Sequence, residues 1–120
     1  MRRLDISDYT VELLNPKAGE KRDDDSLEPE TLDIPYDVKR SLVEMLLSKQ
    51  LELNARALLE RDEIARKILH CTDGFVFLEE EEYKKLVSAI ETLRGLGRPD
   101  VPLMRRILEE TEQVEVEEKK

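Results

Sequence analysis

The stretch "LDISDYTVELL", residues 4–14, decides how the chain begins to fold. Its apolar residues alternate with polar ones: Leu4, Ile6, Tyr9, Val11 and Leu13. A period of two predicts a strand with one buried face. Asn15 and Pro16 end this strand, and "LDIP" (32–35) can supply a short strand that returns to pair with it.

The segment between these strands is acidic and nearly free of apolar residues. "KAGEKRDDDSLEPET" (17–31) has one apolar residue beyond alanine, a run of three aspartates, and both glycine and proline. This composition predicts a mobile loop that cannot bury itself. Two roles stay open for it: a solvated connector, or a segment that becomes ordered on a partner.

Helical spacing begins after the second strand. Pro35 can begin a helix, because its missing N–H would have no partner in the first turn, and "YDVKRSLVEMLLS" (36–48) continues with apolar residues three and four apart. After a break near 48–54, Asn54 is expected to cap a second helix over 55–70. Its apolar stripe is Ala55, Leu58, Leu59, Ala65, Ile68 and Leu69.

Two more helices are predicted further along the chain. "FVFL" (75–78) is a short strand or an apolar anchor, and a third helix begins in "EEEE" (79–82) and ends near Gly95. A shorter fourth helix is predicted in "RPDVPLMRRILEE" (98–110). Three of its residues are expected to face the core: Leu103, Ile107 and Leu108. The tail is too polar for the core, and its Val114/Val116 alternation suits an edge strand against a neighbour.

We therefore predict a mainly α protein with a small β element, of the α+β class. The expected architecture is a compact bundle of three to four helices with an N-terminal strand. Its parts are the strand (1–14), the mobile acidic loop (15–31), the helical domain (32–110) and a charged tail (111–120).

Composition limits the classes of function. A chain of 120 residues is one domain by length. Charged residues make up 41% of it, and the net charge of −9 is spread over both halves. Such a balance argues against a general phosphate-binding surface, so nucleic acid is not an expected partner. No apolar run approaches the roughly 20 residues needed to span a bilayer, and "MRRLDISDY" lacks the apolar region of a signal peptide.

The only histidine and the only cysteine are neighbours, His70 and Cys71, with four glutamates (79–82) shortly after them. A zinc site needs at least three suitable ligands, and no CxxC or HxxxH pattern is present. We interpret His70 and Cys71 as the end of one helix, and the glutamates as the acidic first turn of the next. Without a GxSxG, Walker or GxGxxG motif either, we predict no catalytic residue, metal or cofactor, and no enzyme.

In one stretch of this acidic chain, basic residues outnumber acidic ones. It contains four arginines: Arg94, Arg98, Arg105 and Arg106. Only Asp100 opposes them between residues 94 and 106. They can pair with nearby glutamates (Glu91, Glu109 and Glu110), contact an acidic partner, or bind nucleic acid, although aromatic residues for base stacking are missing. The candidate partner-binding residues are these arginines together with Asp23, Asp24 and Asp25 of the loop.

Three stretches carry a resemblance to a known class of proteins: "IPYDVKRSLVEMLL", "FLEEEEYKKLVSAIE" and "GRPDVPLMRRILEE". Over roughly residues 32–110 the chain resembles small accessory proteins of tailed bacteriophages, including a helix start of the form LxxEEYxxL after a strand. The resemblance implies a role in virion assembly or host takeover, in the host cytoplasm or the virion.

The expected function is therefore a non-enzymatic protein–protein interaction module, such as a tail-assembly or connector factor. Its partners would be phage structural proteins or further copies of itself, and no membrane is involved. The alternative is an acidic inhibitor that occupies a basic site on a host nucleic-acid-processing protein, as a nucleic-acid mimic does.

Overall fold

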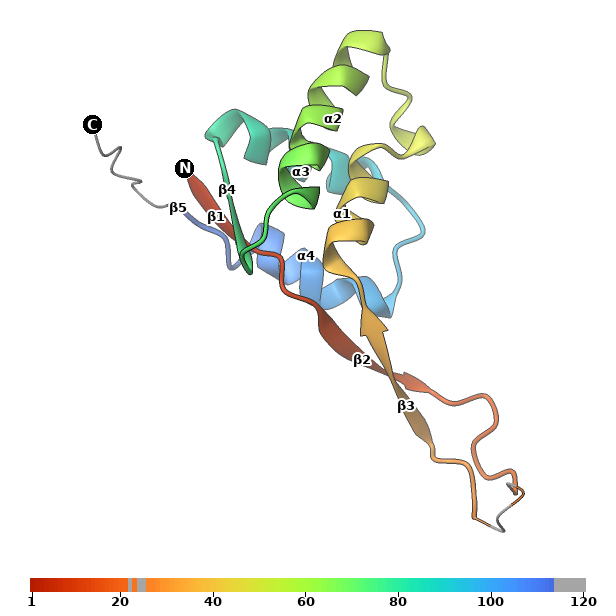
Figure 1. The fold of residues 1–120 in the computed structure, drawn as a ribbon. Helices are drawn as coiled ribbons and strands as arrows, with labels where there is room; N and C mark the ends of the chain where they lie inside the picture. Colours follow the sequence, from red (N-terminus) through yellow and green to blue (C-terminus); the bar gives the residue numbers. More distant parts are fainter. Residues whose placement is uncertain (22, 24–25, 114–120) are drawn as a thin grey trace.

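The computed structural model describes residues 1–21, 23 and 26–113, which form four α-helices and five short strands (Figure 1). The strands are β1 (Arg2–Asp5), β2 (Tyr9–Leu14), β3 (Thr31–Tyr36), β4 (Phe75–Leu78) and β5 (Glu112–Gln113). The helices are α1 (Val38–Leu46), α2 (Ala55–Leu69), α3 (Glu80–Thr92) and α4 (Val101–Leu108). Two 3₁₀ turns, Lys49–Leu51 and Arg98–Asp100, follow α1 and precede α4. The predicted α+β class is confirmed.

The strands form two separate antiparallel sheets. One has the order β4-β1-β5, and in it Leu4 of β1 lies opposite Val76 of β4, both buried against the helices. The other contains only β2 and β3, paired in register from Tyr9↔Tyr36 to Leu14↔Thr31. The prediction that 32–35 pairs back on the first strand is therefore confirmed.

One apolar core joins the four helices to the first sheet. Side chains from α1, α2, α3 and α4 meet in it, and the largest fully buried ones are Leu4, Leu42, Leu46, Ile64, Ile68, Leu78, Leu86, Leu103 and Ile107. Burial of each such side chain stabilises the fold by about 1.5–3 kcal/mol. This core makes β1, β4 and the helices one body.

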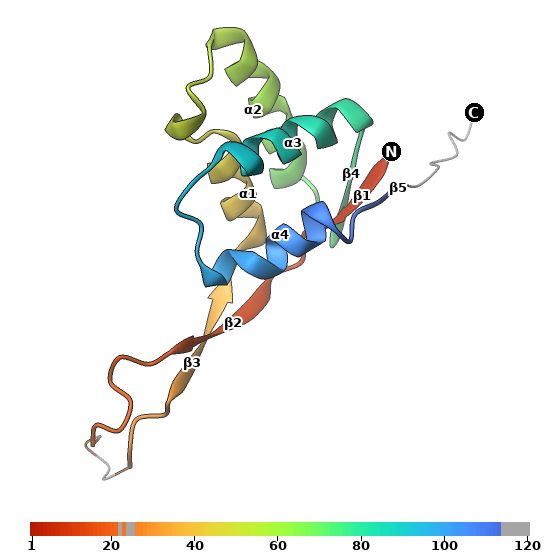
Figure 2. The same cartoon turned by 180° about the vertical axis from the view of Figure 1, so that it is seen from behind.

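The β2–β3 hairpin leaves this body and projects from it, as the views from both sides show (Figures 1 and 2). We call it the arm and define it as residues 9–36. The fold is consequently less compact than the predicted bundle. The predicted single strand over 4–14 is wrong, because the chain turns at residues 6–8: Ser7 N–H donates to the Asp5 carboxylate, and Asp8 accepts from Val38 N–H at the start of α1.

The structure corrects several details of the helices. Pro35 lies in β3, and α1 begins later, with Asp37 as the N-cap that accepts from Arg40 N–H. Asn54 caps α2 as predicted. The predicted apolar stripe of that helix is wrong at four positions, because its buried face is Ile64, Ala65 and Ile68 while Ala55, Leu58, Leu59 and Leu69 are exposed. Leu108 of α4 is also exposed, not inward.

The end of the described chain lies beside its beginning. β5 pairs with β1 through Arg3↔Glu112, so this part of the tail completes the chain's own sheet. The predicted Val114/Val116 edge strand lies outside the described residues. No helix among the residues that the structure describes is long and apolar enough to cross a membrane.

Candidate interaction surface

The arm carries one apolar face along its length. Residues directly opposite each other in an antiparallel pair share a face, and the pairs Val11↔Ile34 and Leu13↔Leu32 follow Tyr9↔Tyr36 in alternation. Ile34 is 42% and Leu32 38% exposed. Val11 is buried, although it is not part of the core of the body. This strip of aliphatic side chains therefore projects away from the core.

The opposite face of the arm is acidic toward its middle. Glu12 lies directly opposite Asp33, and both are exposed. Like charges at directly opposite positions destabilise a strand pair. A cationic group from outside the arm would relieve this repulsion. Leu14, 79% exposed, lies on the same face further out.

Two tyrosines fix the base of the arm. The rings of Tyr9 and Tyr36 are stacked, with centroids 4.7 Å apart and planes 9° apart. The Tyr9 hydroxyl donates to the Pro99 carbonyl at 2.8 Å and accepts from Leu103 N–H at 3.2 Å. Both contacts are at the start of α4, so the arm is held to a helix of the body.

The Tyr36 hydroxyl makes the second link to the same place. It donates to Asp100 Oδ1 at 2.5 Å, while Asp100 Oδ2 accepts from Gly97 N–H. Burial, followed by the hydrogen bond to the Asp100 carboxylate, raises the pKa of Tyr36 well above its ordinary value. The phenol therefore stays protonated and remains a donor at neutral pH.

Arg106 closes the base from the other side. Its guanidinium lies 4.9 Å from the centre of the Tyr9 ring, and its Nη1 donates to the Ser7 carbonyl at 2.6 Å. It also forms an ion pair with Asp5 at 3.5 Å. Arg106 was predicted as a partner-binding residue, but these contacts give it a structural role at the turn between β1 and β2.

The outer part of the arm is more regular than the sequence indicates. Asn15 is buried, with its side-chain amide donating to the Pro29 carbonyl at 2.9 Å, and Gly19 N–H donates to the Glu28 carbonyl. Lys21 forms an isolated bridge with Leu27. The strand pairing thus continues into the segment predicted as a loop, although its mobility stays a prediction.

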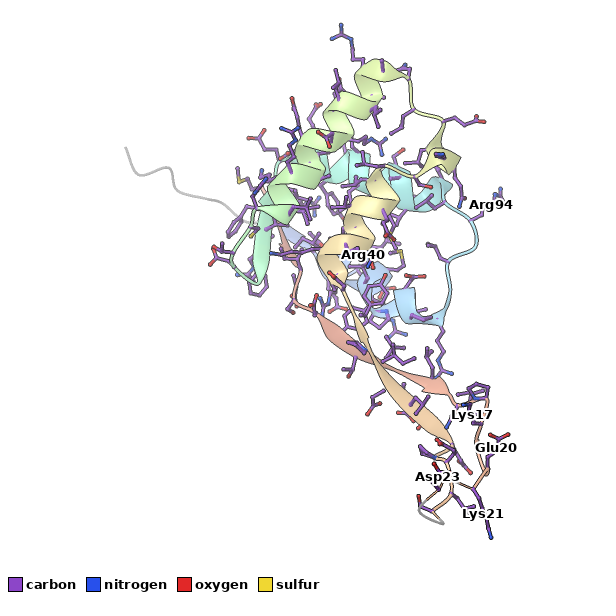
Figure 3. All side chains as sticks on the ribbon, turned by 45° about the vertical axis from the view of Figure 1, so that its right-hand side comes forward. Lys17, Glu20, Lys21, Asp23, Arg40 and Arg94 are labelled. Atoms are coloured by element: carbon purple, nitrogen blue, oxygen red, sulfur yellow. The ribbon has the colours of Figure 1, made fainter. Side chains whose placement is uncertain are left out.

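Of the predicted acidic residues, Asp23 lies at the far end of the arm. Figure 3 shows Asp23 there, exposed, together with Lys17, Glu20 and Lys21, and far from Arg94 on the body. Asp24 and Asp25 lie outside the described residues. Asp23 and Arg94 are therefore not brought together within one chain.

The three other arginines are exposed. Arg94 follows α3, Arg98 opens the 3₁₀ turn before α4, and Arg105 lies on α4. Their side chains form no ion pair with any other described residue, so the predicted pairing with Glu91, Glu109 and Glu110 is not found.

Arg98 and Arg105 alternate with two exposed apolar residues, Val101 and Leu108, which are 44% and 50% exposed. Val101, Arg105 and Leu108 are four and three residues apart, so they lie within an arc of about 60° on the outer face of α4. We call Arg98, Val101, Arg105 and Leu108 the α4 stripe. Arginine is enriched at protein–protein interfaces relative to the rest of the protein surface.

The predicted end of a helix at His70 and Cys71 is confirmed. His70 is the C-cap of α2, and the Cys71 thiol donates to the Phe75 carbonyl at 3.1 Å. Of the glutamates, Glu80 accepts two hydrogen bonds from Arg2, and Glu82 accepts from Glu79 N–H and from Lys67. Within residues 1–21, 23 and 26–113, no three His, Cys, Asp or Glu side chains lie close enough to hold a metal ion.

The tyrosine pair and its contact with Asp100 were not predicted from the sequence. The alternation of apolar residues over Leu32, Ile34 and Tyr36 matches that of Tyr9, Val11 and Leu13, and it would have extended the returning strand to Tyr36. No sequence pattern indicates that Asp100, 64 residues further on, accepts the Tyr36 hydroxyl.

Comparisons with protein-family models, curated proteins and solved structures give no match for this chain.

Proposed function

We propose that this chain is a non-enzymatic interaction module that binds another protein through its arm. The observation that carries the proposal is the apolar face of the arm, where Leu32 and Ile34 are exposed on a ribbon that projects from the body. An isolated two-stranded hairpin is only marginally stable in water. A protein that covers this face would bury aliphatic surface and stabilise the arm.

The base of the arm supports the same proposal. The tyrosine stack, the Tyr36–Asp100 hydrogen bond and Arg106 hold the arm against α4. A projection fixed in this way meets its partner with little further loss of conformational entropy.

We further propose that the module is phage-encoded and acts in virion assembly, as a tail-assembly, connector or similar accessory factor in the host cytoplasm or virion. The resemblance over residues 32–110 supports this assignment.

The nucleic-acid-mimic alternative has less support. A mimic needs carboxylates left free on one face, whereas many carboxylates of the body are paired with cations: Glu80 with Arg2, Glu82 with Lys67, Glu60 with Lys85, and Asp62 with Arg66. Pairing of this kind cancels the negative potential that a basic nucleic-acid site would recognise.

The proposal is tested by co-expressing the tagged chain with the proteins encoded by its neighbouring genes and measuring which are retained. Wild type is compared with the double variant L32S/I34S, which makes the apolar face of the arm polar. The matched control is L14S, because Leu14 is an exposed aliphatic residue on the opposite face of the same arm.

We expect wild type and L14S to retain a virion protein and L32S/I34S to lose it. Circular dichroism should show the same helix content in all three proteins, since each substituted side chain lies outside the core. Equal retention by all three, or retention by none, would refute the proposal.

A further inference from the structure

We propose that one face of α2 binds the same face of a second copy in antiparallel orientation, so that the chain forms a twofold dimer. We call this face the outer face of α2 and define it as Ala55, Leu58, Leu59, Asp62, Arg66 and Leu69. It is separate from the arm, so the inference does not rest on the proposed function. Two features carry it: the spacing of the apolar residues and the order of two opposite charges among them.

Helix α2 exposes apolar side chains on a face that does not pack in the core. Its buried residues are Ile64, Ala65 and Ile68. By contrast, Leu58, Leu59 and Leu69 are 45%, 68% and 50% exposed. A helix that packs on one side only carries charged and polar residues on the other. Three exposed leucines on a helix of 15 residues therefore indicate a second contact.

The outer face has the spacing of a coiled-coil seam. Intervals of four, three, four and three residues separate Ala55, Leu59, Asp62, Arg66 and Leu69. At about 100° per residue, these five positions lie within an arc of about 80°. A repeat of this kind is the pattern by which two helices pack side by side. The outer face therefore suits pairing with another helix.

The two charges in the middle of the seam select a second copy in antiparallel orientation. Asp62 and Arg66 form an ion pair at 3.0 Å within one chain, and both side chains are at least 40% exposed. In an antiparallel pair centred on position 64, Leu59 lies opposite Leu69 of the second copy. Asp62 then lies opposite Arg66 of the second copy, and the twofold symmetry repeats both contacts. One register thus matches leucine with leucine and acid with base.

Other arrangements of two copies place unlike residues together. A parallel pair would put Asp62 opposite Asp62 and Arg66 opposite Arg66, and like charges repel. An antiparallel pair shifted by one heptad would put Leu59 opposite Asp62, or Arg66 opposite Leu69. Polar residues within a seam specify orientation and register in this way. The outer face is therefore complementary to itself in one arrangement.

The proposed contact uses a part of the body that lies away from the arm. Both views show α2 toward one end of the molecule and the β2–β3 hairpin at the other (Figures 1 and 2). A contact in which each copy uses the same face closes on itself, so assembly stops at two copies. The dimer carries two arms, and two linked binding sites raise the effective concentration of the second binding event.

The test measures solution mass by light scattering over a series of protein concentrations. We expect wild type to approach about 28 kDa, twice the 14.0 kDa of one chain, and to form nothing larger. L59S removes two leucine contacts from each dimer and should weaken self-association by about 30-fold or more. The control L108S changes a leucine on α4 that is 50% exposed, and it should self-associate as wild type does.

Charge reversal gives the decisive measurement. D62R places arginine opposite Arg66, and R66D places aspartate opposite Asp62, so each variant alone should self-associate about tenfold more weakly or worse. An equimolar mixture restores both contacts, because one chain then has arginine at both positions and the other has aspartate. The mixture should form the dimer at concentrations at which each variant alone is monomeric. The control R105D makes the same change of charge in the α4 stripe and should leave the wild-type dimer intact.

A wild type that stays monomeric throughout the series would overturn the inference, as would a mixture that stays monomeric or a D62R protein that dimerises like wild type. Loss of the dimer in L108S, R105D or the arm variant L32S/I34S would also overturn it, because the contact would then lie elsewhere. Circular dichroism should show the same helix content in every variant, since each substituted side chain lies outside the core. Retention of a virion protein by the arm is measured separately, so either proposal can fail without the other.

Discussion

The Tyr36 hydroxyl donates a hydrogen bond of 2.5 Å to Asp100 Oδ1, and so joins the end of the arm to the start of α4 across 64 residues of sequence. With the stacked Tyr9 ring beside it, this bond determines where the arm leaves the body.

Substitution Y36F should remove this bond and change the alkaline stability of the protein. At about pH 8 we expect Y36F to be less stable by about 1–2 kcal/mol, because Asp100 loses a donor. Burial and the Asp100 carboxylate raise the pKa of Tyr36, so the folded state holds the phenolic proton more tightly than the unfolded state. The stability that Tyr36 contributes by holding this proton is complete below the pKa of about 10 that tyrosine has in the unfolded state. It is lost as the pH rises above that pKa.

Urea unfolding at about pH 8 and about pH 11 measures both effects. The loss of stability between these two values should be smaller in Y36F than in wild type. Some loss should remain, because burial also raises the pKa of Tyr9. Identical losses in the two proteins would show that Tyr36 does not contribute to the loss of stability at alkaline pH.

Two adjacent arginines should differ sharply in their effect on stability. Arg106 contacts the Tyr9 ring, the Ser7 carbonyl and Asp5, whereas the exposed Arg105 side chain has no ion pair with any other described residue. We expect R106M to lower the free energy of unfolding by about 1–3 kcal/mol and R105M to change it by less than about 0.5 kcal/mol. Urea unfolding of both variants checks this, and equal effects would contradict the structural role of Arg106.

Acid should weaken the contacts of Asp5 at the turn between β1 and β2. Burial of Asp5 opposes its ionisation, but hydrogen bonds from the Ser7 hydroxyl and N–H, together with the Arg106 charge, outweigh burial and lower the pKa of Asp5. The stabilisation by ionised Asp5 is therefore present above the pKa of about 3.9 that aspartate has in the unfolded state. It is lost as the pH falls through the lower pKa of Asp5 in the folded state. Stability of D5N, measured by urea unfolding between about pH 6 and about pH 2, should fall less steeply than that of wild type.

Glu52 offers a stabilising substitution. It ends the 3₁₀ turn after α1 in the left-handed conformation, with φ = 48°. That conformation strains residues with a β-carbon and suits glycine, so E52G should raise the free energy of unfolding by about 0.5–1 kcal/mol. The control E63G, at an exposed position inside α2, should lower it by a similar amount. A loss of stability in E52G would contradict the prediction.

The sequence predicted the parts of this fold that depend on neighbouring residues. Apolar spacing located the helices, and Asn54 and His70 were assigned correctly to the two ends of α2 because end preferences are local. The error at Leu58 and Leu59 arose because spacing shows which residues share a face but not whether another element covers it. The break at residues 6–8 depends on Arg106 and on the start of α1, which are distant in sequence.

The candidate site was predicted only in part for the same reason. The arginine cluster was visible as a charge reversal, yet nothing local distinguishes Arg106, which packs on Tyr9, from Arg105, which is exposed. The apolar face of the arm requires the register between β2 and β3, and two short segments separated by sixteen residues do not specify that register by themselves.

None of the described residues between 10 and 35 belongs to the apolar core of the body. Substitutions there are therefore largely separated from the requirements of folding, and the arm can accumulate changes while the helices keep their packing. In evolutionary terms, this chain can alter what it recognises, or admit insertions at the outer end of the arm, without having to rebuild the domain that carries it.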